Sequence, residues 1–342
     1  MRKSYRVIMR NNRLQGRVTA GRFTLPVVIL ICTVCWISTS FLLPDMSSTK
    51  ETGYALWQSI CTSCLPSWAN RIISFMLYAA IGYFLIELNN TFTIIRMRAS
   101  VQTSLYFLLV TICPGMHLLY AGDVAAVAFL VSLFFLFKSY QQPHPVSYIF
   151  HSFAFIGAGS LLFPQLFYFI PLWLIGAYSF QSLTIRSFCG AIIGISLPYW
   201  FLLGHAFFYG EMELFYQPFI ELVHFQPIEF GKNLQLWELV TLIYLFILFI
   251  VSAAHCIVSG YEDKIRTRSY LHFLIFLNFC IFLFILLQPI HCMDLLSLLL
   301  IGVSILVGHL FVLTSSKTSN VFFIGSTIGL ILLFCFNIWT LL

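Results

Sequence analysis

Long apolar runs occupy most of the chain after its N-terminal segment, and short breaks of polar residues, proline or glycine separate them. The runs 236–259, 270–287 and 321–341 approach or exceed the roughly 20 residues that an α-helix needs to cross a hydrocarbon core about 30 Å thick. Polar and apolar residues do not alternate within them, as they do in the strands of a membrane β-barrel. The pattern therefore predicts an all-α fold, that of a polytopic integral membrane protein.

Breaks at proline, glycine and charged residues divide these runs into about eleven candidate transmembrane helices. They are expected at 23–43, 71–88, 101–120, 122–140, 146–162, 165–181, 186–208, 236–259, 270–288, 294–314 and 321–341. Two divisions, at CPGMHLLYAGD and LLFPQLF, leave the number of spans open between roughly nine and twelve, because such a break either separates two helices or interrupts one.

The chain is expected to have two parts, a basic cytoplasmic segment at residues 1–22 and one multi-span domain at residues 23–342. Segment 1–22 is rich in arginine and free of acids, as organelle transit peptides are. The apolar run that follows it, 23–43, has no small-residue cleavage pattern and is long enough to stay in the membrane as an uncleaved anchor.

Two of the expected outer loops, 44–70 and 209–235, are long enough to contain helices that lie on the membrane surface. In the first loop, Ser48 and Glu51 have the spacing of a capping box, which predicts a short helix at 51–60. In the second loop, apolar side chains recur at helical spacing and leave one polar side. These are Phe215, Phe219 and Leu222 on the apolar side, with Gln217, Glu221 and His224 on the polar side.

Charged residues are scarce, at 9% of the 342 residues against about 25% in an ordinary soluble domain, and their distribution predicts the orientation. Cytoplasmic loops of membrane proteins are enriched in Lys and Arg. With the N-terminus in the cytoplasm, all of the 18 Lys and Arg residues fall on the inner side except Lys50, Arg71 and Lys232. The net charge of +6 is spread over short clusters between apolar runs, so it indicates topology rather than a nucleic-acid surface.

No motif of a soluble enzyme is present, since the chain has no phosphate-binding glycine loop, no H-E-x-x-H and no G-x-S-x-G. Nucleotide hydrolysis is therefore not expected as an energy source, and neither a cofactor nor a metal ion is expected. Of two C-x-x-C pairs, Cys32 and Cys35 lie in the first span, where cysteine behaves as a small apolar residue. Cys61 and Cys64 lie in the first outer loop and are either structural, bonded or free, or a redox pair.

Four histidines are expected near the outer face on four separate connections: His117, His205, His224 and His291. They do not have metal-ligand spacing along the chain. Two interpretations stay open. Either the four side chains meet in space, or each is an interfacial histidine whose polar tip faces water.

Carboxylates in or near a bilayer are the strongest indications of function. An ionisable group there costs free energy, so it is expected to be part of a functional site or to pair with an opposite charge. Asp123, Glu238 and Asp294 lie at or near the starts of helices that enter from outside, where a carboxylate caps free N–H groups. A structural role is therefore expected for these three. The acids of the second outer loop are expected to be solvated and individually uninformative: Glu211, Glu213, Glu221 and Glu229.

A structural role accounts for Asp45 less well than for the other carboxylates. It follows Pro44 at the carboxyl end of the first span, where the helix dipole disfavours an acid. Ser48 is the better cap for the next helix. Asp45 is therefore the candidate catalytic residue.

The first span and first outer loop together resemble the polytopic C-type glycosyltransferases, which use sugars linked to polyprenyl phosphate. In that superfamily the first span leads into a non-cytoplasmic loop with an essential acid near the membrane, followed by an interfacial helix. Asp45 and the segment 51–60 occupy those places. The resemblance implies that Asp45 acts as a general base or orients the acceptor hydroxyl, and that Arg71 and Lys232 bind the lipid phosphate. The chain lacks a second obvious acid pair, and its outer loops are small for that group.

The middle of the chain, LFFLFKSYQQPHPVSYIFHSFAFIGAGSLLFPQLFYFIPLWLIGAYSF (133–180), resembles an uncharacterised family of bacterial polytopic inner-membrane proteins. That resemblance implies a multi-pass protein of the bacterial inner membrane and no particular activity. The expected function is envelope glycan work at the outer face, namely transfer or polymerisation of polyprenyl-linked sugars, with Asp45 and Arg71 at the mouth of a lateral cavity. The alternatives are a transporter or lipid flippase, and a non-catalytic membrane partner in envelope assembly.

Overall fold

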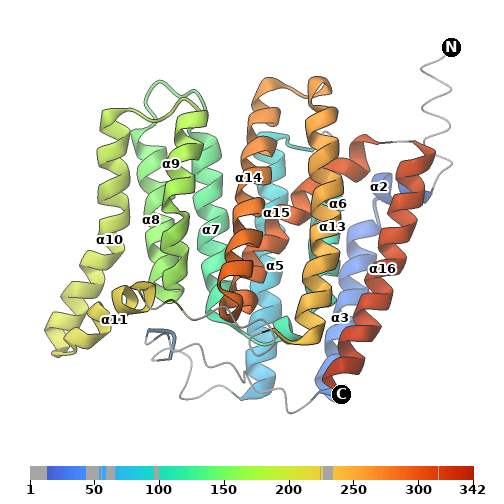
Figure 1. The fold of residues 1–342 in the computed structure, drawn as a ribbon, viewed down its shortest axis with the longest axis horizontal. Coiled ribbons are helices and arrows are strands. Elements are labelled where there is room, and N and C mark those ends of the chain that lie inside the picture. The colour runs from blue at the N-terminus through green and yellow to red at the C-terminus, as the bar shows by residue number, and fades with distance from the viewer. Residues whose placement is uncertain are drawn as a thin grey trace.

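A computed structural model describes residues 14–43, 54, 56–58, 66–95, 100–223, 225, 234–314 and 316–342. Within these residues the fold is all-α, without a β-strand, and the helices form one bundle (Figure 1). This finding confirms the fold class that the apolar runs predict. The expected surface helix at 51–60 falls mostly outside the described residues.

Eight helices of the described residues are long and apolar enough to cross a membrane. They are α3 (Thr24–Leu42), α5 (Ser67–Phe92), α7 (Ala121–Lys138), α10 (Ile185–Tyr209), α13 (Leu236–Val258), α14 (Ile265–Leu287), α15 (Cys292–Leu313) and α16 (Lys317–Leu341). Each of them overlaps one of the expected spans. The apolar runs of the sequence therefore predict these helices well, apart from their exact ends.

Shorter elements complete the bundle. The apolar helices α6 (Ser100–Thr111), α8 (Val146–Leu162) and α9 (Ile170–Ser179) lie between the long ones. The 3₁₀ turns η1 (Pro114–His117) and η2 (Pro164–Phe169) begin at the prolines of CPGMHLLYAGD and LLFPQLF, so the helices are interrupted at both positions. The remaining elements are α2 (Leu14–Ala20), α11 (Met212–Val223), η3 (Gly260–Glu262) and η4 (Pro289–His291).

The two ends of the bundle are distinguished by the residues that meet there. At one end, called the Arg71 end, the Arg71 side chain of α5 donates a hydrogen bond to the carbonyl of Leu43, which follows α3. At the other end, called the Lys138 end, the hydroxyl of Tyr270 in α14 donates to the carbonyl of Phe137 in α7 at 2.8 Å. The long helices run between these two ends (Figure 1).

Positive charge gathers at the Lys138 end. Within the described part of the chain, Arg71 is the only Lys or Arg at the Arg71 end, and the others lie on helix ends or connections at the Lys138 end. These are Arg17, Arg22, Lys138, Arg186, Lys264, Arg266, Arg268 and Lys317. Such a separation is typical of a bundle whose two ends lie on opposite sides of a membrane.

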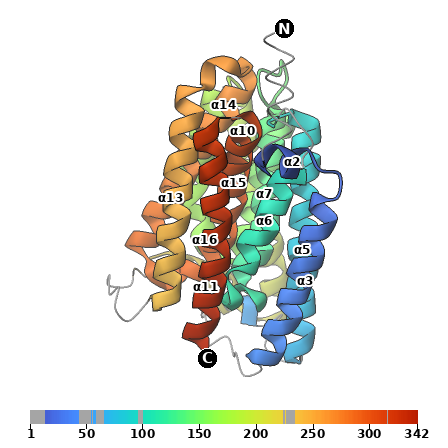
Figure 2. The ribbon, with the colours of Figure 1, turned by 90° about the vertical axis from the view of Figure 1, so that its right-hand side faces the viewer.

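Helix α15 lies at the centre of the bundle. Its residues 292–312 are all buried, and α6, α7, α13 and α14 pack against it. An α-helix that is apolar on every side is typical of a protein core or a membrane span. Figure 2 shows α13, α16, α6 and α3 side by side across one face of the bundle. The centre of this protein is therefore a helix that neither water nor lipid reaches.

Helix α2 is attached to the C-terminal part of the chain through Gln15, which is 3% exposed. The Gln15 side-chain amide donates hydrogen bonds to the carbonyls of Phe311 (2.8 Å) and Thr314 (3.0 Å). Its side-chain carbonyl accepts a hydrogen bond from the hydroxyl of Ser319 (3.1 Å). One side chain of the basic N-terminal segment thus joins the end of α15 to the start of α16.

Replacing Gln15 with leucine is expected to lower the free energy of unfolding by about 1–3 kcal/mol, because buried polar partners lose their hydrogen bonds. Thermal unfolding of the purified protein in detergent measures this change. Leu14→Ala, at a position that is 56% exposed, is the control and is expected to leave the unfolding temperature unchanged. Equal unfolding temperatures for both variants would show that α2 does not stabilise the bundle through Gln15.

Candidate functional site

Helix α11, at the Arg71 end, turns Glu221 toward the bundle. Tyr216, Ile220 and Val223 are exposed, whereas Pro218 and both carboxylate oxygens of Glu221 are buried. The expectation that Glu221 belongs to a solvated loop is therefore wrong. Over its last two turns the outward face of α11 is apolar, as in a helix that contacts lipid, and this orientation places Glu221 on the inward side.

Three polar side chains from distant parts of the chain meet at this end, namely Tyr54, His291 and Asp294, and together with Glu221, whose charge acts on Tyr54, they are called the Tyr54 cluster. The Tyr54 hydroxyl lies 2.9 Å from Nδ1 of His291, and the two rings are stacked with their centroids 6.3 Å apart. Asp294 interacts with the Tyr54 hydroxyl through its side chain, and the charge of Glu221 also acts on it. The cluster therefore joins the segment before α5 to η4 and α15.

The Tyr54 hydroxyl is held in its protonated form. Burial raises the pKa of Tyr54 well above its ordinary value, and the charges of Asp294 and Glu221 raise it further. A tyrosine that keeps its proton is a hydrogen-bond donor. The cluster thus combines one neutral donor with an imidazole and two carboxylates.

Asp123 and Glu238 have the capping roles that their positions predict. Oδ2 of Asp123 accepts a hydrogen bond of 2.9 Å from the N–H of Tyr120, and Oε2 of Glu238 accepts one of 2.9 Å from the N–H of Gln235. Oδ1 of Asp123 also accepts a hydrogen bond of 2.6 Å from the hydroxyl of Tyr78. Both oxygens of Asp123 are therefore engaged within the bundle, which is typical of a structural carboxylate.

Asp294 caps a different helix from the expected one. The sequence places it near the start of its own helix, α15, but its Oδ1 accepts a hydrogen bond of 2.8 Å from the N–H of Gly122 at the start of α7. Gly122 has no side chain, and the α7 backbone lies directly against the α15 backbone at this point. Asp294 therefore joins two helices and is also a member of the Tyr54 cluster.

Of the three site residues that the resemblance implies, the structure describes Arg71, while Asp45 and Lys232 lie outside the described residues. Arg71 is 8% exposed, and its Nη2 donates to the carbonyl of Leu43. Leu43 precedes Asp45 by two positions in the chain. A guanidinium group has five N–H donors, so the bond to Leu43 leaves others for an anion.

The histidines near the Arg71 end have separate surroundings. His117 stacks on Trp36 with ring centroids 4.0 Å apart, His205 is exposed beside Tyr209, and His291 belongs to the Tyr54 cluster. The three described histidines therefore do not meet. A polar tip that faces water is also wrong for His117, which is 2% exposed and whose Nδ1 lies 2.8 Å from the Thr39 hydroxyl. Three other residues singled out in the sequence lie outside the described residues: Cys61, Cys64 and His224.

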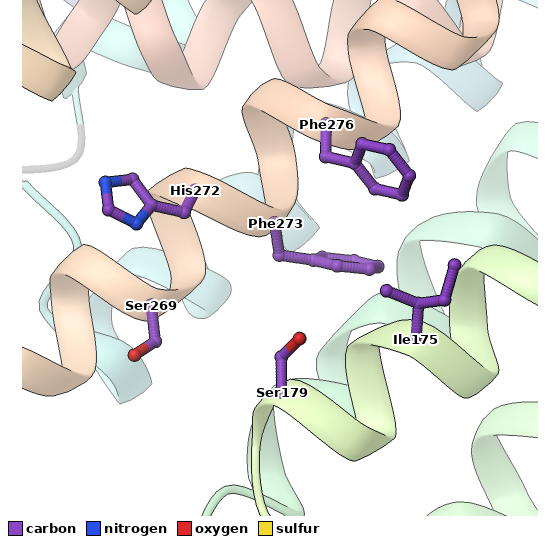
Figure 3. Close-up of a pocket in the computed structure, with 6 residues that line it drawn as sticks. All are labelled: Ile175, Ser179, Ser269, His272, Phe273 and Phe276. Carbon is purple, nitrogen blue, oxygen red and sulfur yellow. The ribbon is translucent and has the colours of Figure 1, made fainter.

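A pocket of about 310 Å³ lies at the Lys138 end, between α9 and α14 (Figure 3). It is lined by Ile175, Ser179, Ser269, His272, Phe273 and Phe276. Hydroxyl and imidazole groups lie beside aromatic rings in this pocket. It is at the opposite end from the lateral cavity expected between Asp45 and Arg71, so it is not that cavity.

Three side chains that can bind a metal ion lie together at the Lys138 end: His255, Cys256 and His309. The spacing of these residues in the sequence does not predict this group. His309 lies 53 positions after Cys256, with a complete helix between them. Patterns of neighbouring ligands along a sequence cannot reveal such a group, because it forms only when α13 packs against α15.

The described part of the chain is all-α and has eight helices of membrane-spanning length, as a multi-pass membrane protein does. At one end of the bundle it has a buried polar cluster, the Tyr54 cluster. No known family model, curated protein or solved structure matches the chain. Its function is therefore inferred from its own residues.

Proposed function

We propose that this protein is an enzyme of the bacterial inner membrane that transfers or polymerises polyprenyl-linked sugars at the Arg71 end. In this proposal about eleven spans cross the bilayer, because α6, α8 and α9 with their adjoining turns cross in addition to the long helices. The Lys138 end faces the cytoplasm and the Arg71 end faces outward. The position of the Lys and Arg residues supports this orientation, since positive residues concentrate on the cytoplasmic side.

The Tyr54 cluster is the observation that carries the proposal. Sugar hydroxyl groups both donate and accept hydrogen bonds, so a sugar site needs donors and acceptors in fixed positions. The Tyr54 hydroxyl and the His291 ring can each exchange their mutual hydrogen bond for one to a sugar hydroxyl, and Asp294 supplies carboxylate oxygens beside Tyr54. Burial strengthens each of these bonds relative to water.

Arg71 supports a phosphate site at the same end. A guanidinium binds phosphate oxygens through parallel N–H bonds, and the bond to the Leu43 carbonyl holds Arg71 at the carboxyl end of α3. Lys232 adds a second positive charge for the lipid phosphate. In the transfer step the acceptor oxygen bonds to the anomeric carbon, the bond from that carbon to the phosphate oxygen breaks, and polyprenyl phosphate leaves. Asp45 takes the proton of the acceptor hydroxyl.

The test uses the purified full-length protein in vesicles that contain polyprenyl-linked glycans extracted from the host membrane. A change in the masses of these glycans is expected, measured by mass spectrometry of the extracted lipids. Arg71→Met is expected to lower the conversion about tenfold or more, because a charged hydrogen bond to phosphate is lost. Lys317→Met, at the opposite end, is the control. Arg71→Lys is expected to fall between Arg71→Met and the native protein, which separates loss of charge from loss of folding.

Other outcomes would support the alternatives. Movement of the glycans across the bilayer without a change in mass would indicate a transporter or flippase. An unchanged glycan pool, together with one stoichiometric partner in a pull-down, would indicate a non-catalytic member of an envelope assembly. Either result would contradict the proposed transfer reaction.

A further inference from the structure

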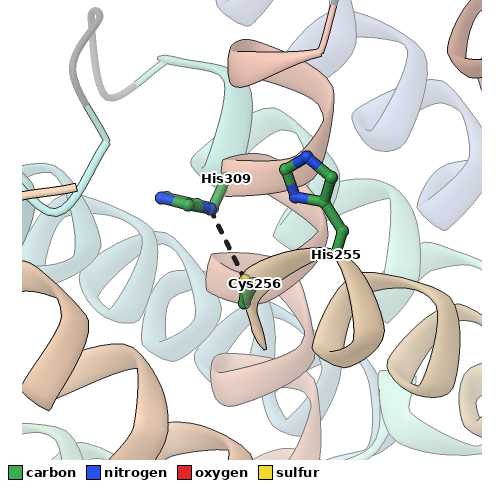
Figure 4. A group of neighbouring side chains, drawn as sticks. All are labelled: His255, Cys256 and His309. Atoms are coloured by element: carbon green, nitrogen blue, oxygen red, sulfur yellow. Dashed lines mark hydrogen bonds between the residues drawn. The ribbon is translucent and has the colours of Figure 1, made fainter. Parts of the chain in front are cut away.

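His255, Cys256 and His309 place three metal-binding atoms next to one another at the Lys138 end (Figure 4). One ring nitrogen or sulfur atom of each residue lies within 4.8 Å of the other two. Nδ1 of His309 is 3.5 Å from Sγ of Cys256. Bonds of about 2.0–2.1 Å to nitrogen and about 2.3 Å to sulfur would place two ligand atoms of a tetrahedral zinc ion at this kind of separation.

The fold brings these residues together through two helices that end at the same side. His255 and Cys256 are near the carboxyl end of α13, and His309 is near the carboxyl end of α15, which packs against α13. The carboxyl end of a helix carries a partial negative charge and favours a cation. Cys256 is 2% exposed and His309 is fully buried, so an ion between them would be largely shielded from water.

Asp263 orients His309 from the side away from Cys256. Its Oδ2 lies 3.2 Å from Nε2 of His309, and the Asp263 side chain is 1% exposed. A carboxylate in this position favours the proton on Nε2, which leaves the lone pair of Nδ1 on the side of the Cys256 sulfur. Zinc-binding histidines commonly have a carboxylate at the ring nitrogen that faces away from the metal.

We infer that His255, Cys256 and His309 bind a transition-metal ion of the zinc class, with Asp263 holding His309 in position. A thiolate and two imidazoles suit Zn²⁺, and three protein ligands leave one tetrahedral position for water. Binding releases the thiol proton of Cys256, so affinity falls as the pH is lowered. The ion joins α13 to α15 at the end opposite the Tyr54 cluster, and the inference does not depend on the proposed glycan transfer.

Cys256 also lies within hydrogen-bond distance of His309, and Asp263 lies beside the other ring nitrogen, so the experiment must distinguish a bound ion from these contacts alone. Full-length protein is purified in detergent with Cys61→Ser and Cys64→Ser, because that C-x-x-C pair is itself a common zinc-binding motif. Metal content is measured after incubation with Zn²⁺ and removal of unbound ion. One Zn²⁺ per chain is expected. Co²⁺ in its place is expected to give a sulfur-to-cobalt charge-transfer band.

Variants then assign the site. Cys256→Ser and His309→Ala are each expected to lose the ion and the charge-transfer band, while Cys113→Ser removes another buried thiol and is expected to keep both. Asp263→Asn leaves all three ligands in place and is expected to weaken affinity about 10–100-fold. This variant keeps the test decisive if the others do not fold.

Three results would overturn the inference. The first is a folded native protein that takes up no Zn²⁺. The second is a folded Cys256→Ser protein that keeps its ion, since the site would then lie elsewhere. The third is an Asp263→Asn protein with native affinity, which would remove the role of the carboxylate. Thermal unfolding of each variant establishes that it is folded.

Discussion

Replacing Gly122 with alanine is expected to lower the stability of the bundle. The loss is expected to exceed that of the same replacement at any other glycine that packs against the central helix α15. A Cβ atom at Gly122 would lie within 3.0 Å of three atoms of Asp294, two of which belong to the α15 backbone. Backbone atoms cannot rotate away as a flexible side chain can, so α7 and α15 would have to separate. Overpacking of this kind costs about 1–3 kcal/mol, occasionally more. The separation would also weaken the bond from the Gly122 N–H to Asp294.

Gly325 and Gly204 supply matched controls for Gly122→Ala. Both lie in long helices, α16 and α10, and a Cβ atom at either would have no neighbour within 4 Å. Alanine there is expected to be neutral or to stabilise by up to about 1 kcal/mol, because glycine is the poorer helix former. Thermal unfolding and the yield of monodisperse protein measure the difference. If Gly122→Ala and Gly325→Ala unfold at the same temperature, the close approach of α7 to α15 is not stabilising.

Asp45→Asn is expected to reduce glycan transfer about 100-fold to 10,000-fold, the range that a general base contributes. Asparagine keeps the shape of the side chain but cannot take a proton from the acceptor hydroxyl. Asp45 also has no structural role that its position explains, because it follows α3 at the end where the helix dipole disfavours an acid. Folding is therefore expected to be unaffected.

The measurement is the rate of change in glycan mass in the vesicle assay, with Glu213→Gln as the control. Glu213 is an exposed acid in the first turn of α11, at the same end of the bundle. It is expected to be dispensable. Native activity in the Asp45→Asn protein would exclude Asp45 as the base and would direct attention to Asp294 and Glu221.

Most of the helices could be predicted because an apolar run inside a bilayer can satisfy its backbone hydrogen bonds only by forming a helix or a closed barrel. The start of α5 shows where this argument fails. The helix begins at Ser67, before the expected start at 71, because polar residues of its first turns find partners inside the bundle. Asn70 accepts a hydrogen bond of 2.9 Å from the N–H of Leu119, and Arg71 donates to Leu43. Such partners cannot be read from the residues beside them in the sequence.

The candidate site was less predictable than the helices. The sequence indicates that Asp294 and His291 are polar residues of the outer face, but it predicts a solvated Glu221, because the loop that contains Glu221 is rich in acids. Its burial depends on which side of α11 packs toward α10 and η2, and that choice is made by tertiary contacts. The sequence does not single out His309 for a related reason, since its partner Cys256 belongs to another helix.

The contact between Gln15 and the carbonyl of Phe311 joins residues 296 positions apart, and it has a consequence for biosynthesis. A ribosome makes the N-terminal segment first, yet the binding site for α2 does not exist until α15 and α16 have been made. Helix α2 can therefore take this position only after the chain has been synthesised as far as Ser319. The contact at Gln15 thus forms after the chain between α2 and α16 has been made, so it belongs to a late stage of assembly rather than to the insertion of the first span.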